Sequence, residues 1–129
     1  MAIWAMADLH LSLGTDKPMD NFHGWYDYVN RIEHNWRENV AEEDTVVIPG
    51  DFSWGIDLEE ALPDFRFIEN LPGKKLIMKG NHDYWWTTRA KTEKFFNVSL
   101  SFSHWSFMRS RLSIYLVSNG SSHFEGLDR

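Results

Sequence analysis

The chain has 129 residues and a formal net charge of -6, with 43% hydrophobic and 16% aromatic residues and no cysteine. That length suits one domain with a single hydrophobic core, and the acidic charge argues against binding nucleic acid through bulk electrostatics. Without cysteine, a bound metal must be held by His, Asp, Glu or Asn. The N-terminus lacks the features of a signal peptide and no apolar run reaches membrane-spanning length, so we expect a cytoplasmic protein.

Apolar segments alternate with helical patterns along the first part of the chain. Residues 2–7 are short and apolar and end at the sequence DLH, which predicts a buried strand. From Phe22 apolar residues recur every three or four positions, which predicts a helix of about 20 residues capped by Asp20 or Asn21. The β-branched run at 45–51 predicts a second buried strand.

The same alternation continues to about residue 97. Asp57 and Glu60 have the spacing of a capping box before a helical pattern that reaches Leu71, and Pro63 is expected to kink or split that helix. Residues 74–80 predict a third strand and residues 85–96 a further helix. This β-α-β-α-β-α series predicts an α/β fold with a largely parallel sheet covered on both faces.

Polar residues follow each predicted strand, in the sequences DLH, GDFSW and GNHDYWW. Ligands of parallel sheets bind at the carboxyl ends of the strands. Asp8 and His10 are two residues apart on a segment expected to be extended, so both side chains can face one ion. Asp51 follows a glycine and could bridge two ions, and Asn81 adds a neutral oxygen ligand. Oxygen and imidazole ligands without sulfur suit Mn, Fe, Zn or similar divalent ions.

Such a site could hydrolyse a phosphoester. Two ions about 3.5 to 4 Å apart would clamp a phosphoryl group and lower the pKa of a bridging water, which supplies hydroxide at neutral pH. His82 could protonate the leaving oxygen as a general acid. Asp83 could fix the tautomer and orientation of the His82 ring.

The three motifs DLH, GDFSWG and GNHD, in this order and each after a predicted strand, resemble the first three motifs of the calcineurin-like metallophosphoesterases. The resemblance implies an α/β sandwich of two sheets flanked by helices, with hydrolysis of phosphomonoesters or phosphodiesters. It also implies that Asp8 and His10 bind the first metal and that Asp51 bridges the two ions. Asn81 then binds the second metal, and His82 is the acid near the leaving group.

The resemblance covers about residues 1–97, and the composition changes beyond them. Nine of the eleven serines lie in residues 98–129, and the family's later histidine motifs are absent, since His104 and His123 are the only downstream histidines. We therefore expect residues 1–97 to be the N-terminal half of the phosphoesterase domain and residues 98–129 to be an atypical tail, out of frame or truncated. An incomplete sheet would expose an edge and an apolar face, which predicts self-association.

Other interpretations of the same features remain open. The chain could be a catalytically incompetent fragment that binds metal weakly or needs a partner, and a nucleic-acid-binding module built on the Trp residues is disfavoured by the acidic charge. The acidic run at 42–44 is interpreted as a solvated loop. Four aromatic residues beside the proposed site could stack on a substrate ring, but we favour packing of the ligand loops for Trp54, Tyr84, Trp85 and Trp86.

Overall fold

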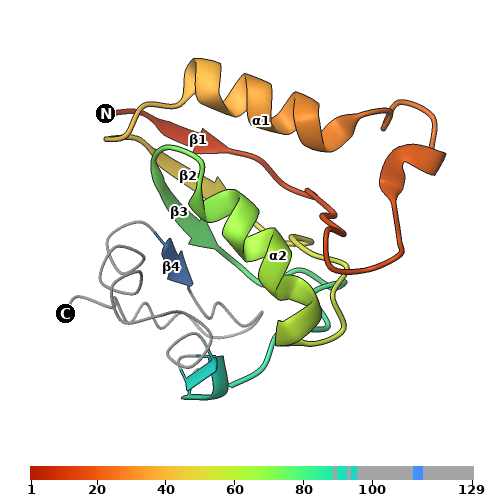
Figure 1. Ribbon diagram of the computed structural model, residues 1–129. Helices are drawn as coiled ribbons and strands as arrows, with labels where there is room; N and C mark the ends of the chain where they lie inside the picture. Colours follow the sequence, from red (N-terminus) through yellow and green to blue (C-terminus); the bar gives the residue numbers. More distant parts are fainter. Residues whose placement is uncertain (89, 93, 96–111, 115–129) are drawn as a thin grey trace.

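Four parallel strands form one sheet in the order β1-β2-β3-β4 (Figure 1). The computed structural model describes residues 1–88, 90–92, 94–95 and 112–114. The strands are β1 (Ile3–Ala5), β2 (Thr45–Ile48), β3 (Lys74–Ile77) and β4 (Leu112–Ile114). The predicted parallel sheet is confirmed, and its last strand comes from the part of the chain that we expected to be an atypical tail.

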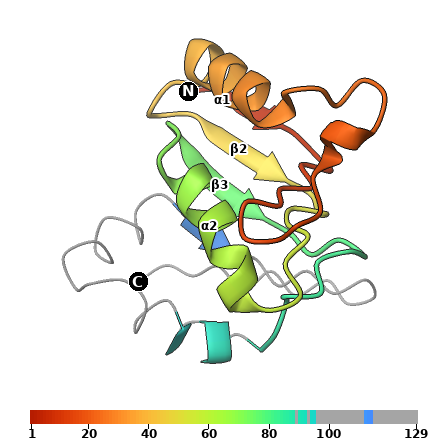
Figure 2. The ribbon, with the colours of Figure 1, turned by 45° about the vertical axis from the view of Figure 1, so that its right-hand side comes forward.

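The two long helices lie on the same face of this sheet. Helix α1 (Tyr28–Asn39) connects β1 to β2, and α2 (Leu58–Glu69) connects β2 to β3. In Figure 1, α2 crosses in front of the sheet and α1 runs alongside β1, and in Figure 2 α1 overlies β1 while α2 overlies β3. Successive right-handed crossovers between neighbouring parallel strands place their helices on one side, because the strand order does not reverse. The expected helical cover of the second face is not found among the residues that the structure describes.

The hydrophobic core lies between this face and the helices. Val46 and Ile48 of β2 alternate with less buried neighbours, as a period of two requires. The Trp36 indole of α1 is 1% exposed, and its Nε1 donates to the carbonyl of Pro72 over 2.9 Å. The core is completed by fully buried side chains from α2, β3 and the loops: Phe65, Ile68, Ile77, Phe52, Leu11 and Leu71.

Helix α1 begins later than the apolar period predicts. A short 3-10 helix, η1 (Met19–Asn21), is followed by non-helical residues up to Asp27. Gly24 and Asp27 have φ angles of 89° and 51°, and this left-handed backbone cannot continue an α-helix. The prediction of a cap at Asp20 or Asn21 is therefore wrong, and Asp27 occupies the N-cap position. Asp20 instead accepts a hydrogen bond from the Asp27 backbone N–H over 2.9 Å.

Helix α2 agrees more closely with its sequence signals. The Asp57 carboxylate accepts from the Glu60 N–H over 2.9 Å, so the predicted N-terminal cap is confirmed. The Glu60 carboxylate accepts from the Ile56 N–H, one residue before the usual capping-box donor. Pro63 lies inside the helix without splitting it. Of the helix predicted at 85–96, residues 85–88 are not helical, whereas residues 90–92 and 94–95 have helical backbone.

Strand β1 is exposed, although a buried strand was predicted. The side chains of Ile3 and Trp4 are 78% and 39% exposed. The strand lies at the edge of the sheet and pairs only with β2 among the described strands. Its apolar residues therefore lack the cover that two neighbouring strands and a second helical layer would give.

Asp44 is buried, which makes the prediction of a solvated acidic loop wrong at this residue. Its carboxylate accepts hydrogen bonds from the backbone N–H groups of Ala41 and Ala2 over 3.0 and 2.6 Å, and from the Trp4 indole over 3.0 Å. These bonds, the two backbone donors foremost, lower the pKa of Asp44 to about 2. The carboxylate thus joins the start of β1 to the turn before β2. No helix in the described part of the chain is long and apolar enough to cross a membrane.

Candidate metal centre

The loops after β1 and β2 run side by side at the carboxyl end of the sheet. Their pairing continues beyond the regular strands as an irregular ladder with a parallel bridge between Leu11 and Ser53. Backbone hydrogen bonds of 2.8 to 3.2 Å join the two loops, from Asp8 N to Gly50 O, His10 N to Asp51 O, Leu11 N to Phe52 O and Trp54 N to Leu11 O. This ladder places the DLH and GDFSW segments next to each other, as the parallel topology predicts.

The backbone conformation of this edge differs from the prediction. Asp8, His10 and Asp51 have φ angles of 56°, 44° and 50°. The segment is therefore not extended, and the predicted reason for convergence of Asp8 and His10, a strand period of two, is wrong. A left-handed backbone at a residue other than glycine costs about 1 to 3 kcal/mol and is concentrated at functional sites. Here it turns three side chains toward one point.

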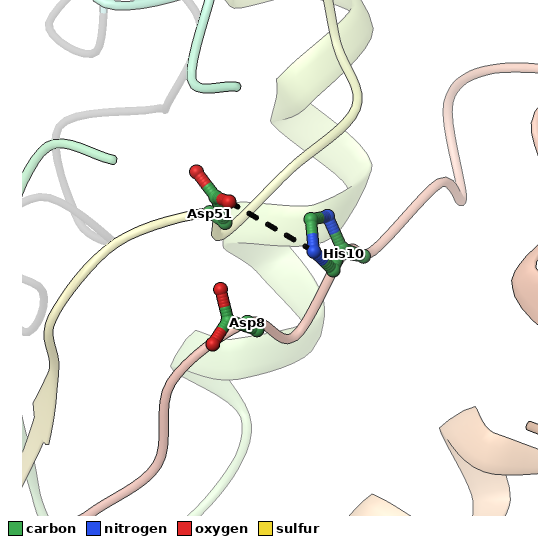
Figure 3. Close-up of side chains that lie close together, drawn as sticks. All are labelled: Asp8, His10 and Asp51. Carbon is green, nitrogen blue, oxygen red and sulfur yellow. Dashed lines mark ion pairs between the residues drawn. The ribbon is translucent and has the colours of Figure 1, made fainter. Parts of the chain in front are cut away.

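These three side chains form a group that can hold a metal ion (Figure 3). One ligand atom from each of Asp8, His10 and Asp51 lies within 4.8 Å of the others, and the His10 Nε2 is 3.9 Å from Asp51 Oδ2. Metal–ligand bonds of about 2.0 to 2.2 Å keep the ligands of one ion within roughly 4.4 Å of each other. Two carboxylates and an imidazole at nearly this spacing fit a divalent ion such as Mn, Fe or Zn.

Two glycines allow the loop after β3 to approach Asp51. Gly50 has a φ of 131°, and a Cβ atom on it would lie 2.6 Å from the Cα of Gly80. A Cβ atom on Gly80 would lie 2.2 Å from both the backbone N and Oδ1 of Asp51. Side chains larger than hydrogen are excluded at such distances, so the contact between the GDFSW and GNHD loops depends on both glycines.

His82 contacts Asp51 twice. Its backbone N–H donates to Asp51 Oδ1 over 2.9 Å, and its ring Nδ1 lies 3.0 Å from Oδ2. Burial alone raises the pKa of Asp51, but these two hydrogen bonds together with the charges of His82 and His10 lower it. Asp51 is therefore kept as a carboxylate, the form that binds a metal. The His82 side chain is 38% exposed.

The Asp83 side chain joins the loops after β2 and β3. Its buried carboxylate accepts five hydrogen bonds, from the backbone N–H groups of Asp51, Phe52, Ser53 and Gly80 and from the Trp85 indole, over 2.7 to 3.3 Å. The carboxylate beside the His82 ring is that of Asp51, whereas the sequence predicted Asp83. Asp83 therefore fixes the backbone that carries Asp51.

Asn81 lies beside His82 and is exposed. Asp8, His10 and Asp51 converge without it, so its predicted binding to a second metal stays a prediction. The roles assigned to His82 and Asp83 in catalysis stay predictions as well.

The aromatic residues near the site serve different purposes. Trp85 is 2% exposed and packs edge-on against Phe65 at 5.0 Å, which agrees with the favoured packing interpretation. Trp54 is half-buried and stacks on the His10 ring. Tyr84 is 60% exposed and lies edge-on to the His82 ring at 6.3 Å.

A buried polar network beneath the site was not predicted from the sequence. The Asp64 side chain is fully buried and accepts from the Ser53 hydroxyl over 2.5 Å and from the Leu13 N–H over 2.8 Å. The Ser53 oxygen in turn accepts from the Gly55 N–H. Burial raises the pKa of Asp64 to about 6, against the lowering effect of these two bonds. One signal was available, since Asp64 lies three residues after Ala61 and four before Ile68, within the apolar face of α2.

Comparison with known proteins identifies the family of this chain. The gene 66 protein of Mycobacterium phage D29 is 34% identical over 83 residues, which are 63% of this chain and 40% of that protein. A crystal structure of AQ665 from Aquifex aeolicus, a protein of unknown function, is 26% identical with a TM-score of 0.48, covering 73% of this chain and 48% of that one. The chain thus spans less than half the length of either. The family model of calcineurin-like phosphoesterases matches residues 1–128, on both sides of the predicted division at residue 97. The chain therefore belongs to the calcineurin-like phosphoesterase family.

Proposed function

We propose that this chain carries the first half of a dinuclear metal site that hydrolyses phosphoesters. The family implies metal-dependent phosphoester hydrolysis. The observation that carries the proposal for this chain is the convergence of Asp8, His10 and Asp51 within 4.8 Å. These three residues would hold one divalent ion, and Asp51 and Asn81 would contribute to a second. Bound ions would polarise the phosphoryl oxygens and supply a hydroxide nucleophile at neutral pH.

The chain's own residues account for the other parts of the reaction. Asp51 accepts from the His82 ring, which keeps that imidazole at the edge of the metal group with its side chain partly open to solvent. From this position His82 would donate a proton to the departing alcohol oxygen. Asp83 holds the backbone of Asp51 and Gly80, so the carboxylate and the imidazole keep their relative position while substrate binds.

Hydrolysis of a generic aryl phosphodiester tests the proposal. Purified chain with Mn²⁺ is expected to release the aryl alcohol, and Asp51→Asn is expected to abolish the release because it removes a charged ligand. Asp16→Asn is the matched control, since it makes the same charge change at an exposed residue and should leave the rate unchanged.

The alternative is a catalytically incompetent fragment, and it is kept because the chain matches only 40% of the length of the phage protein. Calorimetric titration with Mn²⁺ separates the two. Less than one bound ion per chain, with no hydrolysis by the wild-type protein, would support the fragment. One or more bound ions with activity that depends on Asp51 would support the enzyme.

A further inference from the structure

The ring of His10 has no hydrogen bond to fix its orientation among the described residues. Its Nε2 faces Asp51 at 3.9 Å, and its Nδ1 is buried without a hydrogen-bond partner. Histidines that bind metals usually donate their other ring nitrogen to a carboxylate or a carbonyl, which sets the ring plane. Here the described chain offers no such acceptor, so packing must set the plane of the ring.

Trp54 provides that packing. Its indole stacks on the His10 ring with centroids 4.9 Å apart and an interplanar angle of 23°. Trp25 closes a second side of the His10 ring edge-on, at 6.1 Å. Tyr28 donates its hydroxyl to the His10 carbonyl over 3.0 Å, which fixes the backbone and leaves the ring free to turn. Among these contacts, only that of Trp54 opposes rotation with a parallel flat surface.

The same indole also packs against His82. The Trp54 and His82 centroids are 5.1 Å apart, and the two imidazoles lie 5.9 Å from each other. One side chain therefore contacts both a predicted metal ligand and the predicted acid. Trp54 is itself held, because its backbone N–H donates to Leu11 over 2.8 Å and its Nε1 donates to the Met19 sulfur over 3.4 Å.

We infer that Trp54 is a positioning residue: it stacks on the imidazole of His10, in the place of the hydrogen-bonding partner that such a ligand usually has, and it packs at a tilt against the imidazole of His82. The inference rests on the proposed function in one respect, since it takes His10 as a metal ligand. The flat face of the residue, more than its apolar volume, is what the site requires. Phenylalanine at position 54 should therefore preserve the positions of the two imidazoles, and leucine should not.

Metal affinity measured by calorimetry with Mn²⁺ tests this inference. Trp54→Leu is expected to weaken binding about tenfold or more, the range found when the partner of a metal-bound histidine is removed. Trp54→Phe is expected to stay within about threefold of wild type by the same reasoning. Trp86→Leu is the matched control, because Trp86 is also half-buried and packs on Trp85 rather than on either histidine.

A second measurement reports on the ring itself, without metal. Nuclear Overhauser contacts between the ring protons of His10 and Trp25 should persist in Trp54→Phe and weaken in Trp54→Leu. If Trp54→Leu does not fold, as judged by circular dichroism, Trp54→Met removes the flat face in its place. Neither readout depends on hydrolysis, so an inactive wild-type protein would count against the proposed function alone.

Three results would overturn the inference. The first is wild-type Mn²⁺ affinity in Trp54→Leu. The second is an equal loss in Trp86→Leu or in Trp54→Phe, which would mean a general packing effect. The third is an unchanged set of His10 to Trp25 contacts in Trp54→Leu.

Discussion

Replacing Asp64 by asparagine is expected to change how the stability of the fold depends on pH. Asp64 is fully buried beneath the site, and burial raises its pKa from 3.8 to about 6. A carboxyl whose pKa is higher in the folded state binds its proton more tightly there. Its contribution to stability is therefore complete below pH 3.8 and is lost as the pH rises through about 6.

The size of this effect follows from the two pKa values. A rise from 3.8 to about 6 corresponds to a loss of about 3 kcal/mol once the group is ionised in both states. Roughly 2 kcal/mol of that loss falls between about pH 4.5 and pH 7.5. Asparagine carries no charge at any of these pH values. Its amide can still accept from the Leu13 N–H, and its NH₂ group can face the Ser53 oxygen.

Urea unfolding of wild type and Asp64→Asn across this pH range measures the difference directly. The free energy of unfolding of the variant, relative to that of wild type, should rise by about 2 kcal/mol from the acidic to the alkaline end of this range. Subtracting the wild-type value at each pH removes the contribution of other titrating groups. Ser53→Ala should steepen the dependence, because the hydroxyl that lowers the pKa of Asp64 is removed. Carboxyl ¹³C NMR should find Asp64 titrating near pH 6. A difference that does not vary with pH, or an Asp64 pKa at or below 3.8, would refute this reasoning.

Three further predictions concern the edges of the sheet. Gly80→Ala should lower stability by about 1 to 3 kcal/mol and weaken Mn²⁺ binding, because the added Cβ would clash with Asp51. Wild-type Mn²⁺ affinity of this variant in calorimetry would contradict the close approach of Gly80 to Asp51. Asp44→Asn should lower stability above about pH 4 and make the loss of stability in acid shallower. The reason is that a pKa lowered to about 2 in the folded state gives stability that is lost as the pH falls from 3.8 toward 2. Urea unfolding curves at pH 7 that match those of wild type would count against this prediction. We also propose that the exposed β1 edge mediates self-association. Ile3→Lys should therefore reduce the average mass that light scattering measures at high protein concentration. A wild-type protein that is monomeric at every concentration would exclude this.

The sequence predicted the parts of the fold that periodicity and local chemistry determine. The strands at 45–51 and 74–80, the cap at Asp57 and the meeting of the three motifs at one edge follow from patterns that span a few residues. The start of α1 was missed because the apolar period runs on through Gly24, where a left-handed backbone interrupts the helix. Periodicity records which side of a helix would be apolar, but it does not record where the backbone stops being helical.

The sequence predicted which residues form the candidate site, but it did not predict how the backbone brings them together. Residue types and order were enough to select Asp8, His10 and Asp51. Their left-handed conformations and the hydrogen bonds of Asp83 depend on contacts between segments about 30 residues apart, which no local pattern encodes. The burial of Asp64 was open to prediction, since its position in the apolar face of α2 follows from helical spacing alone.

Asp83 explains how two acidic residues can lie close together at this edge. Asp51 and Asp83 are both buried, and two neighbouring carboxylates repel each other unless donors compensate their charge. Asp83 receives five N–H donors, one of which is the backbone of Asp51 itself, whereas Asp51 receives two from His82. The N–H groups that bind the Asp83 carboxylate thus compensate its charge and join the β2 and β3 loops. Asp51 has fewer such donors and retains the capacity to bind a cation. Because the donors of Asp83 come from the chain itself, the loops that carry Asp51 and His82 are held in place by the fold, and a metal ion would enter a site whose backbone is already formed.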